Sequence, residues 1–181
     1  MKSSDDSKSK ALKWEQSGKL ASRLSADGEV AATLTWARSW GSLATGKSGD
    51  SEWTFKRLGF LRPRVTVREV GSDSNLAVLS LNWVGEGAVV FSDGEAFQFK
   101  RSGFWHPEWA MLDSRGVRVF LLRPDSGWRK RKADIEFPGE AALGNRALLL
   151  AILGWYVIIL ISDYDYDGGG SFAAVMAASG M

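Results

Sequence analysis

The feature of this sequence that most constrains its fold is an apolar run near the C-terminus, RALLLAILGWYVIILIS, which extends from Arg146 to Ser162. Between Ala147 and Ile161 there is no polar stripe at helical spacing, so a helix formed by this run is apolar on every side. Such a helix needs protein or lipid all around it. The run is therefore either the core of a domain or a membrane span, and the preceding chain has to distinguish the two.

The chain from Leu12 to Phe137 consists of short segments in which apolar and polar residues alternate. In one of them Trp53 and Phe55 flank Thr54, so the two rings share a face. This period of two predicts β-strands with one face toward a core. The predicted inward residues are Val30, Ala32, Leu34, Trp36, Trp53, Phe55, Val65, Val67, Leu79, Leu81, Trp83, Phe97, Phe99, Val117, Val119 and Leu121.

Turn signals separate these segments roughly every ten residues. Several are short links that contain glycine, such as Asp27-Gly28 and Asp93-Gly94, and they supply the positive φ that tight hairpins need. Consecutive strands are therefore predicted to pair antiparallel, about twelve in all. They are expected near residues 12–16, 19–25, 29–36, 41–47, 51–57, 63–70, 75–82, 86–91, 95–100, 105–112, 117–122 and 128–136.

So many strands with one apolar face favour closure into a barrel, because closure removes exposed edges. A barrel of about eight strands is filled by its own side chains, whereas a wider one leaves a lumen, and a helix about 10–12 Å across suits such a space. The predicted fold class is mainly β: a closed antiparallel barrel of about twelve strands around a central C-terminal hydrophobic helix, residues 145–162. The core positions expected on this helix are Leu149, Ile152, Leu153, Gly154, Trp155 and Ile159.

The order of several motifs resembles the tubby-like superfamily, which includes the tubby C-terminal domain, the LURP-one-related proteins and the phospholipid scramblases. The motifs are WTFKRLGF followed by PRVTVREV, the turns at 83–87 and 91–94, EWAMLDSRG, and the closing LGWYVIILI. Together they cover most of residues 12–162. The resemblance implies a twelve-stranded antiparallel barrel around a C-terminal hydrophobic helix, and it suggests the binding of anionic membrane lipids.

A membrane span is the alternative interpretation of the apolar run. A span needs about 20 apolar residues, with roughly 17 as a lower limit, and residues 147–161 fall short of both. The basic residues upstream and the aspartates downstream favour a cytoplasmic N-terminal side for such a span. Gly154 costs roughly 1 kcal/mol of helix propensity relative to Ala. The close approach of a barrel strand or of a neighbouring helix would each explain it, so both interpretations stay open.

The densest basic segment is WRKRK, from Trp128 to Lys132. As a strand it would place cations on both faces, and a barrel lumen cannot accept unpaired cations, so the segment is expected at an edge or rim. It is either a solvated charged strand or a contact for anionic lipid headgroups, where each basic residue contributes about 1 kcal/mol. The predicted headgroup contacts are Arg129, Lys130, Arg131 and Lys132, and a second, looser basic group consists of Lys56, Arg57, Arg62 and Arg64.

The segment that follows the apolar run matches the first half of a calcium-binding loop. Asp163, Asp165 and Asp167 alternate along the chain and precede Gly168, as in D-x-D-x-D-G. The match then fails, because Ala174 stands where the closing bidentate Glu is expected. These aspartates are a weak candidate calcium site, and the favoured interpretation is a solubilising acidic tail.

Composition restricts the function further. The net charge of +2 does not favour nucleic acid, and the chain has no cysteine and one histidine, His106. A thiol–histidine pair and a zinc site of several histidines or cysteines are therefore excluded, and no enzyme activity and no cofactor are predicted. MKSSDDSKSK at the N-terminus lacks the apolar segment of a secretory signal, so a cytoplasmic location is expected, with membrane association as an extension.

The sequence thus predicts one domain, residues 12–162, between a disordered tail at 1–11 and an acidic, glycine-rich disordered tail at 163–181. The predicted function is a non-enzymatic binding or scaffold module of tubby-like fold that binds anionic membrane lipid headgroups peripherally. The alternative is a tail-anchored single-pass membrane protein with a cytoplasmic β domain and scramblase-like lipid handling. Nothing in the sequence points to a particular protein partner.

Overall fold

A computed structural model describes residues 10–39, 41–59, 62–82, 84–103, 105–125, 131–139 and 144–166, without the side chains of residues 10, 11 and 163–166. The described chain forms a series of strands followed by one helix. The elements are β1 (Lys10–Gly18), β2 (Ala21–Ala26), β3 (Glu29–Trp36), β4 (Ala44–Ser48), β5 (Ser51–Leu58), β6 (Arg64–Glu69), β7 (Ala77–Leu81), β8 (Gly87–Phe91), β9 (Ala96–Ser102), β10 (Glu108–Leu112), β11 (Arg118–Pro124), β12 (Ala133–Phe137) and α1 (Asn145–Tyr166).

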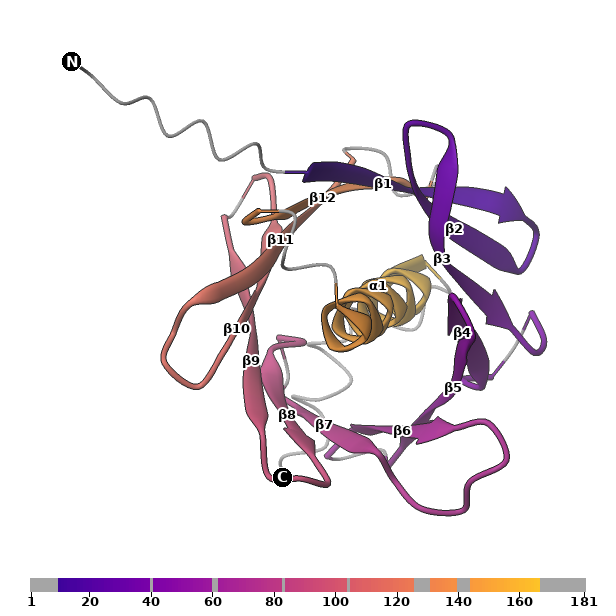
Figure 1. The fold of residues 1–181 in the computed structure, drawn as a ribbon, viewed down its shortest axis with the longest axis vertical. Coiled ribbons are helices and arrows are strands. Elements are labelled where there is room, and N and C mark those ends of the chain that lie inside the picture. Colours follow the sequence, from indigo (N-terminus) through magenta and orange to yellow (C-terminus); the bar gives the residue numbers. More distant parts are fainter. Residues whose placement is uncertain are drawn as a thin grey trace.

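The strands form one closed antiparallel barrel in which each strand pairs with its neighbours in sequence and β1 pairs with β12 (Figure 1). In the closing pair, Leu12 lies opposite Ile135 and Trp14 lies opposite Ala133, and all four are buried. Closure leaves no unpaired sheet edge. The predicted fold class, a closed antiparallel barrel of about twelve strands around a C-terminal helix, is confirmed.

The predicted hairpin chemistry holds at the two-residue turn between β2 and β3. Asp27 and Gly28 alone connect β2 to β3, and both have positive φ, 52° and 85°. Two consecutive positive φ values are those of a type I′ turn, whose twist matches that of the two strands it connects. The strands on either side alternate as expected, and in β9 Phe97 and Phe99 are buried while Gln98 between them is exposed.

In β11 the prediction selected the wrong face. Val117 and Val119 with Leu121 were expected to point inward, but Val117 is 55% exposed and Val119 is only half-buried. Leu121 is buried, yet it lies outside the core cluster, which contains Phe120 and Leu122. The sequence here is apolar on both faces, so alternation alone cannot select the inward one. Pairing with β10 selects the inward face, because Leu122 lies opposite the buried Trp109. A register shift follows on β10 between Met111 and Leu112.

Val30 in β3 is a second departure from the predicted inward faces. It is 54% exposed, although Ala32, Leu34 and Trp36 of the same strand are buried as expected. The ladder between β2 and β3 shifts register between Leu24 and Ser25, which is the partner of Val30. A bulge at the end of a strand changes which face the following residue occupies, and this accounts for the exposure of Val30.

Helix α1 occupies the centre of the ring of strands (Figure 1). Its residues from Leu148 to Leu160 are buried, and the core cluster contains both helix and barrel residues. The helix continues to Tyr166, beyond its predicted end at residue 162. The apolar run is therefore surrounded by protein, which satisfies its all-round apolar character.

Small residues and aromatic stacking set the distance between helix and barrel. A Cβ added to Gly154 would lie 3.2 Å from a ring carbon of Phe99 and 3.3 Å from one of Phe120, so strands β9 and β11 pass close to the helix there. Across the lumen, Trp155 stacks on Trp14 with ring centroids 5.8 Å apart. The glycine predicted to mark a close approach thus faces two barrel strands.

Candidate functional site

The two ends of the barrel carry opposite charge. Because the strands run up and down in order, alternate connections lie at the same end. The end at which α1 begins is closed by the β2–β3, β4–β5, β6–β7, β8–β9 and β10–β11 connections. Each of them carries an aspartate, and we call this the acidic end; the residues are Asp27, Asp50, Asp73, Asp93 and Asp113.

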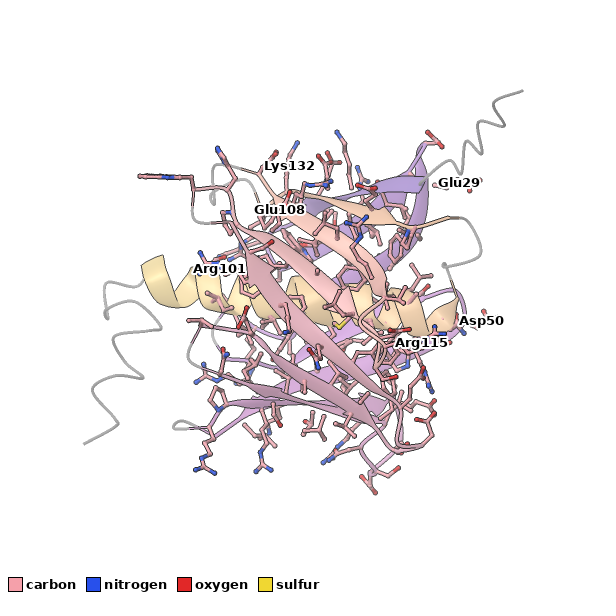
Figure 2. All side chains as sticks on the ribbon, turned by 90° about the vertical axis from the view of Figure 1, so that its left-hand side faces the viewer. Glu29, Asp50, Arg101, Glu108, Arg115 and Lys132 are labelled. Carbon is pink, nitrogen blue, oxygen red and sulfur yellow. The ribbon has the colours of Figure 1, made fainter. Side chains whose placement is uncertain are left out.

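The opposite end, where α1 emerges, is predominantly basic. Figure 2 shows Arg101 toward this end of the helix and Glu29 and Asp50 toward the other. We call it the basic end, and its described basic residues in connections and adjoining strand ends are Lys19, Arg38, Arg57, Arg62, Arg64, Arg101, Arg131 and Lys132. The described acidic residues in the same connections, strand ends and helix end are Glu86, Glu108, Asp125, Asp163 and Asp165.

Several carboxylates of the acidic end form ion pairs and hydrogen bonds within the protein. Asp93 and Glu95 both pair with Arg146 in the first turn of α1, and the Asp93–Arg146 distance is 2.8 Å. The backbone N–H of Glu95 and the Arg146 guanidinium hold the pKa of Asp93 below its ordinary value. In the β10–β11 connection, the N–H of Val117 and the Arg115 side chain lower the pKa of Asp113 in the same way.

The basic end is less internally neutralised. Among the described residues, Lys19, Arg62 and Arg64 form no ion pair. Arg123 differs, because it lies between Glu108 at 2.7 Å and Glu136 at 3.0 Å, and these carboxylates raise its pKa. Exposed cations without carboxylate partners are available to an external anion, whereas Arg123 already has its counter-charges.

The predicted headgroup segment lies at this basic end, although only half of it is described. Arg129 and Lys130 lie outside the described residues, and Arg131 and Lys132 precede β12, which begins at Ala133 instead of the predicted residue 128. Lys132 is exposed, and its Nζ lies 3.4 Å from Glu15. The described part of the segment is therefore a connection between strands, and the predicted alternation of cations along a strand does not apply to it.

The second basic group, which the sequence indicated only loosely, lies at the same end. Arg57 and Arg64 lie at the facing ends of β5 and β6, and Arg62 lies in the connection between them. Arg62 and Arg64 are exposed, whereas Arg57 is half-buried. The fold thus brings the described residues Arg131 and Lys132 of the first group and Arg57, Arg62 and Arg64 of the second to one rim of the barrel.

Two residues of the basic end were missed by the sequence reasoning. Trp105 was assigned to a strand, but β10 begins at Glu108 and Trp105 lies in the preceding loop, 85% exposed. Arg101 is the penultimate residue of β9, and its guanidinium lies 5.7 Å from the ring centre of buried Trp109. A usable signal existed, because Pro107 in the middle of an expected strand favours a loop.

The weak calcium candidate is split by the end of the helix. Asp163 and Asp165 lie within α1, whereas Asp167 lies outside the described residues. Positions two apart on a helix are separated by about 200° around its axis, which differs from the loop conformation that the motif requires. Among the described side chains, no group of three or more His, Cys, Asp or Glu residues is placed to hold a metal ion.

The predicted core positions of the helix all lie inside the barrel. Leu149, Ile152, Leu153, Trp155 and Ile159 are each at most 2% exposed. Four buried indole N–H groups have no hydrogen-bond partner among the described residues, those of Trp14, Trp36, Trp109 and Trp155. Tyr156, next to Trp155, donates its hydroxyl hydrogen to the carbonyl oxygen of Ser42 in the β3–β4 connection.

The same helix is long and apolar enough to cross a membrane by length and composition, over Asn145–Ser162. A buried core helix meets the same criterion. In comparisons with known proteins, no family model, no curated protein and no solved structure matches this chain.

Proposed function

We propose that this protein is a non-enzymatic binding module that docks peripherally on anionic membrane surfaces through its basic end. The observation that carries the proposal is the segregation of charge between the two ends of the barrel. The net charge of +2 hides this asymmetry, because the acidic end offsets the basic one. A barrel polarised along its axis meets an anionic surface with one end and is repelled at the other.

The size of the effect follows from the number of cations. Each Lys or Arg near an anionic leaflet contributes about 1 kcal/mol, and the attraction decays within a Debye length of roughly 8 Å at physiological salt. Lys19, Arg62 and Arg64 are exposed without carboxylate partners, so they retain most of their charge for the surface. Several such residues together give reversible, salt-sensitive binding, as expected of a peripheral protein.

We also propose that the chain is a member of the tubby-like superfamily. Its closed barrel of antiparallel strands with a central C-terminal helix matches the architecture that the resemblance of its motifs implies. The non-enzymatic part of the proposal rests on the sequence, which has no cysteine and only His106 as a histidine. A cytoplasmic location with reversible membrane association is consistent with both.

The alternative, a tail-anchored membrane protein with scramblase-like lipid handling, requires α1 to lie in lipid. Its residues from Leu150 to Leu153 are fully buried inside the barrel. Trp14 of β1 stacks on Trp155, and Trp36 of β3 stacks on Tyr156. The helix cannot fill the barrel and span a membrane at once. Because withdrawal would leave the barrel core empty, these contacts favour the peripheral module.

Vesicle sedimentation tests the proposal. Wild-type protein should sediment with phosphatidylcholine vesicles that contain phosphatidylserine, and added salt should release it. The double variant Arg62→Glu/Arg64→Glu should weaken binding by at least about tenfold, since it removes two attractions of about 1 kcal/mol and adds repulsion.

Arg118→Glu is the matched control, because Arg118 is an exposed arginine at the acidic end. It should bind vesicles as the wild type does. Equal binding by the wild type and the double variant, or no preference for anionic over zwitterionic vesicles, would reject the proposal.

A further inference from the structure

We propose that Trp105 is a membrane anchor, an indole that enters the interface of the anionic bilayer while the surrounding cations contact its headgroups. This inference rests on the proposed function and names the structural element that converts electrostatic attraction into insertion. Trp105 is 85% exposed, while the other exposed large apolar side chains of the described chain are 41–55% exposed. An indole so exposed to water is costly, and the headgroup region of a bilayer suits its apolar ring and polar N–H.

The loop that carries Trp105 is tightly built. Gly103 has a φ of +78°, and a Cβ there would lie 2.4 Å from the carbonyl oxygen of His106, so the backbone doubles back within the loop. Pro107 follows, and Glu108 pairs with Ser102 directly below the loop. The positive φ of Gly103 and its close approach to the His106 carbonyl restrict the backbone on either side of Trp105, which lowers the conformational entropy that docking costs.

The base of the same loop carries a cation fixed to the core. The Arg101 guanidinium lies over the ring of Trp109, which stacks on Phe99 at 5.0 Å inside the barrel. The backbone N–H of Arg101 donates to Glu86 of the β7–β8 connection at 2.9 Å, which links the two neighbouring connections. Arg101 itself is exposed. A headgroup phosphate that contacts Arg101 would thus lie next to the Trp105 indole, on the side of the indole that faces away from the bilayer interior.

The position of the cations favours a bilayer over a soluble anion. They come from five of the six connections at this end and their adjoining strand ends, all except β7–β8, so they are distributed around most of the rim. An extended flat surface contacts such a ring at many points, whereas a single phosphate would meet only one or two of its members. A soluble anion would also leave Trp105 in water.

Single-stranded nucleic acid is the other polyanion that pairs aromatic and basic residues. Its binding sites are grooves that follow the backbone of the strand. The described cations here surround the end of a barrel from which α1 emerges, and the opposite end is acidic. This arrangement favours an end-on contact with a plane, so the proposal commits to the anionic bilayer.

The full-length chain tests the proposal with Trp105→Ala. Partition onto vesicles of phosphatidylcholine and phosphatidylserine should weaken about tenfold, because partial burial of a large aromatic side chain is lost. The loss should persist at intermediate salt concentrations that reduce the effect of Arg62→Glu/Arg64→Glu without releasing the wild type, because salt does not screen the insertion of an indole. The thermal midpoint should change little, because Trp105 lies outside the core cluster, and Val117→Ala at the acidic end is the control for an exposed apolar residue.

Fluorescence locates the indole directly. Vesicles with brominated acyl chains should quench the wild type more than Trp105→Phe, and the difference between the two isolates Trp105 from the other tryptophans, of which the chain has nine in all.

The outcomes separate the two proposals. If the wild type binds anionic vesicles and the arginine variant does not, but Trp105→Ala binds normally and quenching is unchanged, the anchor is wrong and the binding module stands. If the wild type ignores anionic vesicles, the binding module itself is wrong. Binding of an oligonucleotide that depends on Trp105, or a dimer that Trp105→Ala dissociates, would assign the indole to another partner and overturn the anchor.

Discussion

At the scale of single residues, Gly154 shows how the helix and the barrel are matched. Alanine is the better helix former by roughly 1 kcal/mol, so a glycine in the middle of α1 needs a reason in packing. Two ring carbons, of Phe99 and Phe120, lie 3.2 Å and 3.3 Å from the place where a Cβ would be. Both rings are fully buried, and each contacts a second ring, so neither has room to withdraw.

We therefore expect Gly154→Ala to destabilise the protein by about 1 kcal/mol, because overpacking of roughly 1–3 kcal/mol outweighs the gain in helix propensity. Urea or thermal unfolding measures it. Ala147→Gly, at a half-buried position of the same helix, measures mainly the propensity effect with a small loss of core contact, and it should also cost about 1 kcal/mol. A higher thermal midpoint for Gly154→Ala would show that the rings yield and that packing does not require the glycine.

At the scale of elements, the start of α1 is fastened to the β8–β9 turn. Arg146 pairs with Asp93 and Glu95, and its guanidinium lies 4.4 Å from the ring centre of Phe91. A cation in the first turn opposes the helix dipole, so the two carboxylates offset an otherwise unfavourable placement. This contact joins a helix and a hairpin that are distant in sequence.

The contact predicts a pH dependence. The Glu95 N–H and Arg146 lower the pKa of Asp93 in the folded protein below its unfolded value of about 3.8. The stability that this group adds to the folded state is therefore present above the unfolded pKa and is lost as the pH falls through the lower folded pKa. Arg146→Met should lower the thermal midpoint by a few degrees at pH 7, and the difference from wild type should shrink below pH 3.8.

Arg115→Met is the control for this element, because Arg115 pairs with Asp113 of its own turn and joins no helix to the barrel. It should shift the midpoint less than Arg146→Met does. A difference between Arg146→Met and wild type that grows in acid would mean that the carboxylates do not carry the contact.

At the scale of the whole molecule, helix and barrel depend on each other. The core cluster includes residues from all strands that face the lumen together with the helix from Leu148 to Leu160. Without the helix, a closed barrel this wide would leave a cavity that its own side chains cannot fill. Without the barrel, the helix would expose an apolar surface on every side.

Truncation after Gly144 should therefore abolish cooperative unfolding and produce a species that binds a hydrophobic dye, whereas truncation after Tyr166 should leave the thermal transition intact. Circular dichroism and dye fluorescence measure both. The full-length chain should also be released from membranes by carbonate. A truncated chain that stays folded, together with a full-length chain that resists carbonate, would support the tail-anchored alternative.

Much of this fold follows from local signals in the sequence. Alternation and glycine-containing turns placed the strands, with the largest errors at the starts of β4, β10 and β12, which begin later than predicted, at Ala44, Glu108 and Ala133. Trp105 to Pro107, which precede β10, and Arg131 and Lys132, which precede β12, lie in connections at the basic end. The charge segregation was also accessible, because an up-and-down meander sends alternate turns to the same end and an aspartate stands in every second one.

The sequence by itself determined that this protein is a β meander with one apolar helix, since period-two alternation and an all-round apolar run are local properties. Only the tertiary structure decided which face of β11 is inward, because both faces are apolar and pairing with β10 sets the register. It also decided that Gly154 faces Phe99 and Phe120 and that Trp105 is exposed. These features depend on neighbours brought together by barrel closure, and contacts between residues distant in the chain leave no periodic signal in the sequence.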